Sequence, residues 1–143
     1  MKAREDSVVH DHFRGQVLTI NKCKSCKVKS FSFETYWDFP LAFRQTHIRR
    51  GEVTLEDMLR VATQEEDIMD KAFCAECDNE MECTNQQTIW RFPETLVFYL
   101  KRFQIMEQLG NYAKVNVEVK IPVDRLDMDP FIHQESRINL SYL

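Results

Sequence analysis

"NKCKSCKVKS" (residues 21–30) places two cysteines three positions apart within a run of lysines, and "FCAEC" (residues 73–77) repeats that cysteine spacing far downstream. The two pairs are Cys23 with Cys26 and Cys74 with Cys77. Two residues between cysteines allow one tight turn to present both thiols to a single ion. The long separation of the pairs indicates that a whole substructure is inserted between the two turns.

Four cysteine thiolates are a ligand set typical of structural zinc, and they leave no coordination position open for a substrate. We therefore expect Cys23, Cys26, Cys74 and Cys77 to hold a structural Zn²⁺ ion. The alternatives are buried thiols without a ligand, and disulfides. The lysines around the first pair would offset part of the negative charge of the site; they are Lys22, Lys24, Lys27 and Lys29.

Cys83 is the fifth cysteine and lies outside the paired spacing. It could compete as a ligand, but we expect a small, buried or half-exposed thiol on a strand.

Composition restricts the classes of protein that this chain can represent. It has 143 residues and a net charge of −4, which indicates one domain and disfavours nucleic acid as a partner. The remaining alternative among nucleic-acid-binding proteins is a zinc module that binds phosphates through "KCKSCKVK" and "HIRRG". No apolar run is long enough to span a membrane, so no membrane partner is expected. The charged start is not a secretory signal, which favours a reducing intracellular compartment, cytoplasmic or nuclear.

The order of hydrophobic patterns predicts an α+β, β-rich fold. One helix is expected after Gly51, because Thr54 and Asp57 resemble a capping box ahead of an apolar stripe. Strands 12–23 and 29–43 are expected to pair antiparallel through the first cysteine turn. The other expected strands are 81–92, a central strand over 95–103, a half-buried strand over 114–122 with Val115, Val117, Val119 and Ile121 on one face, and 137–143.

The order of the motifs resembles the ubiquitin-specific protease family (ubiquitin C-terminal hydrolase type 2). The segments that carry the resemblance are "HFRGQVLTINKCKSCKVKSFSFETYWDFPL", "TLEDML", "FCAEC", "FPETLVFYLKRF" and "KVNVEVKIPVDRLDMDPFI". They extend from about residue 12 to the end of the chain, after a lead-in over residues 1–11. Two paired-cysteine motifs followed by "LKRF" in this order are far more specific than the cysteine pairs alone.

The resemblance implies part of a papain-like cysteine protease domain, with a zinc-ribbon-like finger built on four cysteines. Residues 12–90 would form the fingers, including the zinc site, and residues 91–143 the palm. Ubiquitin or ubiquitinated proteins would be the partners, together with the missing thumb segment of the same enzyme. The resemblance places a blocking loop at residues 104–113. It also suggests Phe103, Gln104 and Tyr36 as residues that contact ubiquitin.

The alternative for such aromatic residues is that they fill the core of this domain. For Phe31 the core is the preferred expectation.

The catalytic motifs of the family are not matched. No Gly-Asn-Thr-Cys stretch occurs, and Ile138 stands where the family has a tyrosine ahead of its catalytic base. We therefore name no catalytic residue, and the four histidines are expected to be surface residues; they are His10, His12, His47 and His133. The chain would be a segment of a deubiquitinating cysteine protease that, when complete, hydrolyses the bond after ubiquitin's C-terminal glycine. The alternative is a non-catalytic ubiquitin-binding protein of the same fold.

Overall fold

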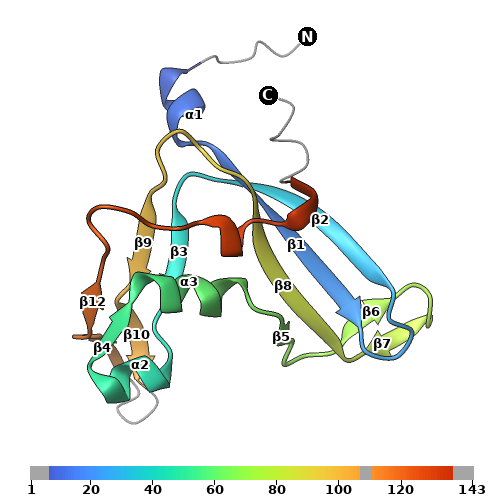
Figure 1. Cartoon of the computed structure of the whole chain (residues 1–143). Helices are drawn as coiled ribbons and strands as arrows, with labels where there is room; N and C mark the ends of the chain where they lie inside the picture. The colour runs from blue at the N-terminus through green and yellow to red at the C-terminus, as the bar shows by residue number, and fades with distance from the viewer. Residues whose placement is uncertain (1–6, 107–110, 137–143) are drawn as a thin grey trace.

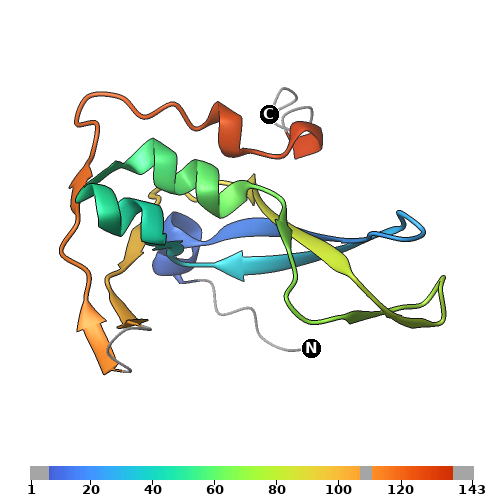
Figure 2. The same cartoon turned by 90° about the horizontal axis from the view of Figure 1, so that it is seen from below.

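The computed structural model describes residues 7–106 and 111–136, which form a long arm and a body at its base (Figure 1). The arm is an antiparallel sheet in the strand order β2-β1-β8-β5, with a separate hairpin at its outer end. Its strands are β1 (Gly15–Cys23), β2 (Lys29–Tyr36), β5 (Glu66–Asp67), β8 (Cys83–Arg91) and the hairpin β6 (Ala72–Cys74) with β7 (Asn79–Met81). Figure 2 shows this arm projecting away from the helices.

Strand β1 organises the arm because it is hydrogen-bonded on both sides. It pairs with β2 from Gly15↔Tyr36 to Lys22↔Lys29, and with β8 as far as Cys23↔Cys83. The predicted antiparallel pairing through the first cysteine turn is therefore confirmed. Strand β2 is an outer strand of this sheet, and every residue from Lys29 to Thr35 is exposed.

The body contains the remaining elements. Its helices are α2 (Gln45–Arg50), α3 (Leu55–Thr63) and the 3-10 helix η1 (Asp129–Phe131), and helix α1 (Val8–Phe13) precedes the arm. Its strands are β3 (Phe39–Ala42), β4 (Glu52–Thr54), β9 (Phe98–Lys101), β10 (Phe103–Met106), β11 (Asn111–Lys114) and β12 (Glu118–Lys120). The pairs β3–β9 and β4–β12 are parallel, and β10–β11 is an antiparallel hairpin.

Helix α3 is the helix that the capping pattern predicts. The Thr54 hydroxyl accepts a hydrogen bond from the Asp57 backbone N–H at 3.1 Å, which satisfies one of the free donors of the first turn. Leu55, Met58 and Leu59 are buried against the body, so the apolar stripe is core. Helix α2 is not predicted from the sequence; it is a short helix that ends at Gly51, whose φ of 75° is accessible to glycine without strain.

Three strand predictions are wrong in detail. Residues 29–43 form two strands and not one, because β2 ends at Tyr36 and β3 pairs with β9. Residues 95–103 do not form one central strand, because β9 covers only Phe98–Lys101 and its side chains alternate between half-buried and exposed. Its partner within the described residues is β3, in a two-stranded parallel pair. Over 114–122 the strand is limited to β12, with Val115 and Val117 buried but Ile121 exposed. The predicted terminal strand, residues 137–143, lies outside the described residues.

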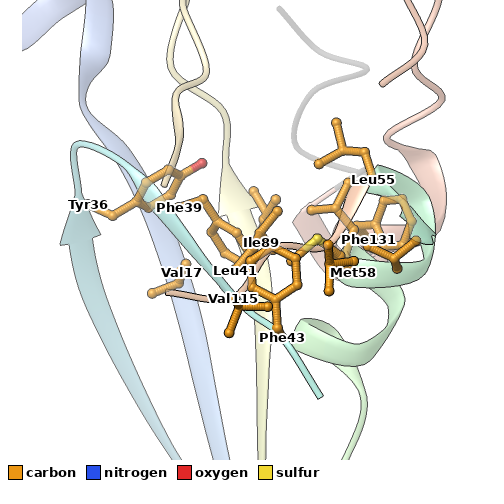
Figure 3. Packing of buried hydrophobic residues seen from close by; sticks show 13 residues of the cluster. Val17, Tyr36, Phe39, Leu41, Phe43, Leu55, Met58, Ile89, Val115 and Phe131 are labelled. Carbon is orange, nitrogen blue, oxygen red and sulfur yellow. The ribbon is translucent and has the colours of Figure 1, made fainter. Parts of the chain in front are cut away.

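The main core joins the base of the arm to the body (Figure 3). It takes Val17 and Ile89 from the arm and packs them with Leu41, Met58 and Val115. Burying one such side chain stabilises the fold by about 1.5–3 kcal/mol. The base of the arm is thus anchored by apolar packing, whereas its outer part is not in this cluster.

Arg102 connects the strands of the body through its guanidinium group. Its Nη1 donates to the carbonyl oxygens of Val117 at 2.9 Å and Val115 at 3.2 Å. The guanidinium also lies over the ring of Phe43, 5.2 Å from the centroid. This side chain therefore fixes the segment ahead of β12 against Phe43, the residue that follows β3.

We expect Arg102→Lys to destabilise the protein by about 2 kcal/mol, because an ammonium group cannot keep the planar contact with Phe43 and both carbonyl hydrogen bonds. The measurement is urea unfolding followed by circular dichroism. Arg125→Lys at an exposed position is the matched control and should change the unfolding free energy by less than about 0.5 kcal/mol. Equal effects of the two substitutions would contradict this role.

Candidate metal centre

The first cysteine turn connects β1 to β2. The Cys23 backbone N–H donates to the Val28 carbonyl at 3.0 Å, and the Lys27 N–H donates to the Cys23 carbonyl at 3.0 Å. These two bonds close a tight turn around Cys26. The Sγ atoms of Cys23 and Cys26 consequently lie within 4.8 Å of each other.

The second turn connects β6 to β7 and repeats the same backbone feature. Lys27 has φ 65° and Asp78 has φ 49°, and each directly follows the second cysteine of its pair. The left-handed conformation is unfavourable for residues with a Cβ atom. Sequence reasoning missed these two positions, because neither carries the glycine that signals a left-handed turn.

The structure brings together all four predicted ligands. The Sγ atoms of Cys23, Cys26, Cys74 and Cys77 all lie within 4.8 Å of one another. The Sγ–Sγ distance is 4.0 Å between Cys23 and Cys77, and 3.5 Å between Cys26 and Cys74. A tetrahedral zinc ion with bonds of about 2.3 Å places its sulfur ligands roughly 3.8 Å apart. The cluster could therefore hold a metal ion with little rearrangement.

Burial and hydrogen bonding differ among the four thiols. Cys23 and Cys74 are buried, whereas Cys26 and Cys77 are half-buried. The Cys26 backbone N–H hydrogen-bonds to the Cys23 sulfur and lowers the pKa of Cys23 to about 6. The neighbouring Cys26 thiol raises the pKa of Cys77 to about 12. Cys23 is therefore closer than Cys77 to the anionic form in which a cysteine binds a metal ion.

The basic run around the first turn faces acidic side chains of the adjoining segment. Lys24 Nζ lies 2.9 Å from Asp67 and 3.6 Å from Glu82, and Lys22 Nζ lies 3.8 Å from Glu65. The hydrogen bond with Asp67 raises the pKa of Lys24. These pairs are solvent-exposed and contribute little stability. They show that carboxylates are partners of two of the four lysines that were expected to offset thiolate charge.

Cys83 is a buried thiol at the start of β8, as the sequence predicts. Its thiol donates to the Met81 carbonyl at 3.5 Å, and burial raises its pKa. It packs beside Cys23 and Cys74 without belonging to the four-sulfur group.

In the described structure, the partners of the four histidines are groups other than cysteine thiols. His10 packs edge-on against Trp37, His12 pairs with Glu94, and His133 lies against Trp90. The expectation that all four are surface residues is wrong for His47, which is 6% exposed. Its Nδ1 accepts the Arg44 backbone N–H at 3.2 Å, and burial lowers its pKa.

The three residues suggested for a partner surface lie in different environments. Phe103 is 69% exposed on β10. Tyr36 is 8% exposed and packs against Phe39 in the main core, which favours the core alternative for this residue. Gln104 lies in β10, and its side chain is outside the described part of the chain. The preference for Phe31 as a core residue is wrong, because Phe31 is 59% exposed on the outer strand β2.

The fold of the chain occurs in solved structures of deubiquitinating modules. One is described as "Structure of the SAGA Ubp8/Sgf11/Sus1/Sgf73 DUB module bound to ubiquitin aldehyde"; it matches with a TM-score of 0.75 at 22% identity, over 92% of this chain and 28% of that chain. The arm with four clustered cysteines and the mixed body therefore have the β-rich α+β fold of these modules, with a zinc-ribbon-like finger.

The family follows from the sequence comparisons. The chain belongs to the ubiquitin carboxyl-terminal hydrolase family, whose model matches residues 1–142. Ubiquitin carboxyl-terminal hydrolase 2 of Gallus gallus is 37% identical over 134 residues, which are 92% of this chain and 36% of that protein. Ubiquitin carboxyl-terminal hydrolase 21 of Homo sapiens is 33% identical over 130 residues, 90% of this chain and 23% of that protein. The chain thus spans about a third or less of the length of these relatives.

Replacing Lys27 by glycine should stabilise the protein by roughly 0.5–1 kcal/mol, because glycine adopts the left-handed conformation without a Cβ clash. Thermal and urea unfolding measure the change. Lys29→Gly is the matched control: it removes the same side chain from strand β2 and should destabilise by up to about 1 kcal/mol. Destabilisation by both substitutions would show that strain at residue 27 is negligible.

Proposed function

We propose that this chain is the fingers-and-palm segment of a deubiquitinating cysteine protease and that it binds ubiquitin. Membership of the ubiquitin carboxyl-terminal hydrolase family over residues 1–142 is the observation that carries this proposal. The solved structure of the same fold, described as bound to ubiquitin aldehyde, supports ubiquitin as the ligand. In the complete enzyme, the segment would take part in hydrolysis of the bond after ubiquitin's C-terminal glycine.

The arm and the body would have separate tasks in binding. We assign residues 12–90 to the fingers and residues 91–143 to the palm, a division that falls next to the end of β8 at Arg91. The palm would contact ubiquitin through Phe103, an exposed aromatic residue on β10. Such contacts, remote from the reacting bond, supply binding energy that can hold the bond in position for attack. A thumb segment of the same enzyme would complete the ubiquitin-binding surface.

The nucleophile and the base would come from another part of the enzyme. Four of the five cysteines form the metal cluster, and burial raises the pKa of Cys83, the opposite of what a thiolate nucleophile needs. His47 is buried and engaged with the Arg44 backbone N–H. The isolated chain should therefore release no product from a fluorogenic ubiquitin C-terminal amide.

The metal in the cluster is proposed to be zinc. Thiolates are soft ligands that zinc binds tetrahedrally, and the four Sγ atoms within 4.8 Å of one another suit that geometry. Cys23, Cys26, Cys74 and Cys77 would occupy all four positions, so the ion would be structural. The free state of all five cysteines suits a reducing compartment, cytoplasmic or nuclear. No helix among the described residues is both long and apolar enough to cross a membrane.

Cys74→Ser should abolish tight zinc binding and lower the melting temperature sharply, because metal binding of this kind contributes on the order of 10 kcal/mol to folding. Native mass spectrometry gives the zinc content, and calorimetry gives the melting temperature. Cys83→Ser is the matched control, since it alters a buried cysteine outside the cluster by the same chemical change. A zinc-free wild-type protein, or unchanged melting of Cys74→Ser, would refute the assignment.

Titration of isotope-labelled ubiquitin with the chain should give saturable chemical-shift changes, and Phe103→Ala should weaken binding about tenfold by removing one exposed aromatic contact. Phe73→Ala is the control, because Phe73 is comparably exposed (67%) but lies at the outer end of the arm on β6. Absence of shift changes at high concentration would count against ubiquitin binding. An equal loss of ubiquitin affinity in both variants would contradict the assignment of Phe103 as a ubiquitin contact.

A further inference from the structure

The arm carries a fifth thiol directly beside the metal cluster. Cys83 on β8 is the cross-strand partner of Cys23 on β1, and both are buried in one cluster with Cys74. The proposed function leaves Cys83 without a role. A thiol packed beside Cys23 and Cys74 is nevertheless a potential partner in oxidation chemistry.

The backbone shows which kind of cross-strand pair this is. The Cys23 N–H is bonded to Val28 on the β2 side, and the Cys83 carbonyl accepts from the Ile68 N–H on the other side of β8. The bond that joins β1 to β8 at this level runs from the Lys24 N–H to the Glu82 carbonyl at 2.9 Å. Cys23 and Cys83 are therefore a non-hydrogen-bonded pair.

This register favours a disulfide. In non-hydrogen-bonded antiparallel pairs, the Cα atoms lie about 4.5 Å apart and the side chains share one face. A disulfide accepts Cα–Cα distances of roughly 4.4–6.8 Å. A bond between Cys23 and Cys83 would thus form within the existing strand pair, whereas a bond between Cys26 and Cys74 would have to join two separate turns.

We propose that Cys83 is a resolving thiol. When a cysteine of the metal cluster is oxidised, Cys83 forms a reversible disulfide with Cys23. Peroxide would react first with a half-buried ligand sulfur, such as Cys77, because Cys23 and Cys83 are buried. Cys77 is a suitable first site because its sulfur lies 4.0 Å from that of Cys23. Oxidation would therefore pass inward, from the surface of the cluster to the strand pair.

The chemistry balances with hydrogen peroxide as the oxidant. Cys77 first gives up its thiol proton to water, its sulfur attacks one peroxide oxygen, the O–O bond breaks and hydroxide leaves, so Cys77 becomes a sulfenic acid. The Cys23 thiolate then attacks the Cys77 sulfur, forming an S–S bond and expelling hydroxide. Cys83 loses its proton to hydroxide and attacks the Cys23 sulfur, which releases Cys77 as a thiolate. Two thiols and one peroxide thus give one disulfide and two waters after proton uptake.

The consequence for the metal site is the loss of one ligand without irreversible damage. Cys23 is withdrawn from the cluster, and the three remaining cysteines are left unoxidised. A reductant would return Cys23 and allow the full ligand set to form again. Only this metal-release consequence rests on the proposed zinc site, because the disulfide itself involves residues of the chain alone.

The test uses the full chain, with and without added zinc, treated with equimolar hydrogen peroxide and then alkylated. Peptide mapping by mass spectrometry identifies the cross-link, and a chromogenic chelator measures zinc release. We expect Cys23–Cys83 as the main disulfide, loss of zinc from the loaded protein, and recovery of most zinc binding after reduction. In Cys83→Ser, the final exchange cannot occur, so we expect the Cys23–Cys77 disulfide to replace Cys23–Cys83 as the main cross-link, with zinc binding still recovered after reduction.

Any main product without the Cys23–Cys83 bond overturns the proposal, whether it is Cys23–Cys77, Cys26–Cys74 or a sulfinic acid. An identical disulfide map for Cys83→Ser and the wild type does the same. If Cys83→Ser does not fold, the peptide map of the wild type decides alone. A chain that binds no zinc would refute the proposed metal, but the mapped disulfide would still decide the role of Cys83.

Discussion

The arm depends on the closure of its outer end by sulfur atoms. Most of β2 is exposed, and the main core reaches only the base of the arm through residues such as Val17 and Ile89. Farther out, the buried cluster consists of Cys23, Cys74 and Cys83, with small or partly buried neighbours. The ladder on both sides of β1 brings the two cysteine turns together, and ligand bonds would supply cohesion that apolar burial does not provide there.

The same arrangement links the arm to the proposed binding of ubiquitin. β1 and β8 run without interruption from the main core to the cluster, so the position of the outer end is determined by packing at the base. In the body, Arg102 fixes the segment before β12 by bonds to two carbonyl groups. A partner held between arm and body would therefore meet two surfaces whose relative position is set before binding, which reduces the entropic cost of association.

Local and spacing signals predicted much of this structure. The cysteine spacing predicted the four-sulfur cluster, and Thr54 with the following apolar stripe predicted helix α3. The failures concern contacts between distant segments. The parallel pairing of β9 with β3 and the exposure of Phe31 on an outer strand depend on which strands become neighbours, and a residue pattern does not encode that choice. Helix α2 was not predicted because it is short. The left-handed conformation of Lys27 was not predicted because no glycine occupies that position.

The outer strand β2 has a practical consequence for work with this protein. Its outer edge pairs with no strand of residues 7–106 and 111–136 and so presents backbone donors and acceptors, and Phe31 and Phe33 are exposed on this strand together with the charged Lys29 and Glu34. An exposed edge of this kind can template strand addition from another chain. Concentrated preparations should therefore self-associate through β2, and an additional lysine at Ser32 would be the substitution of choice for crystallisation or spectroscopy.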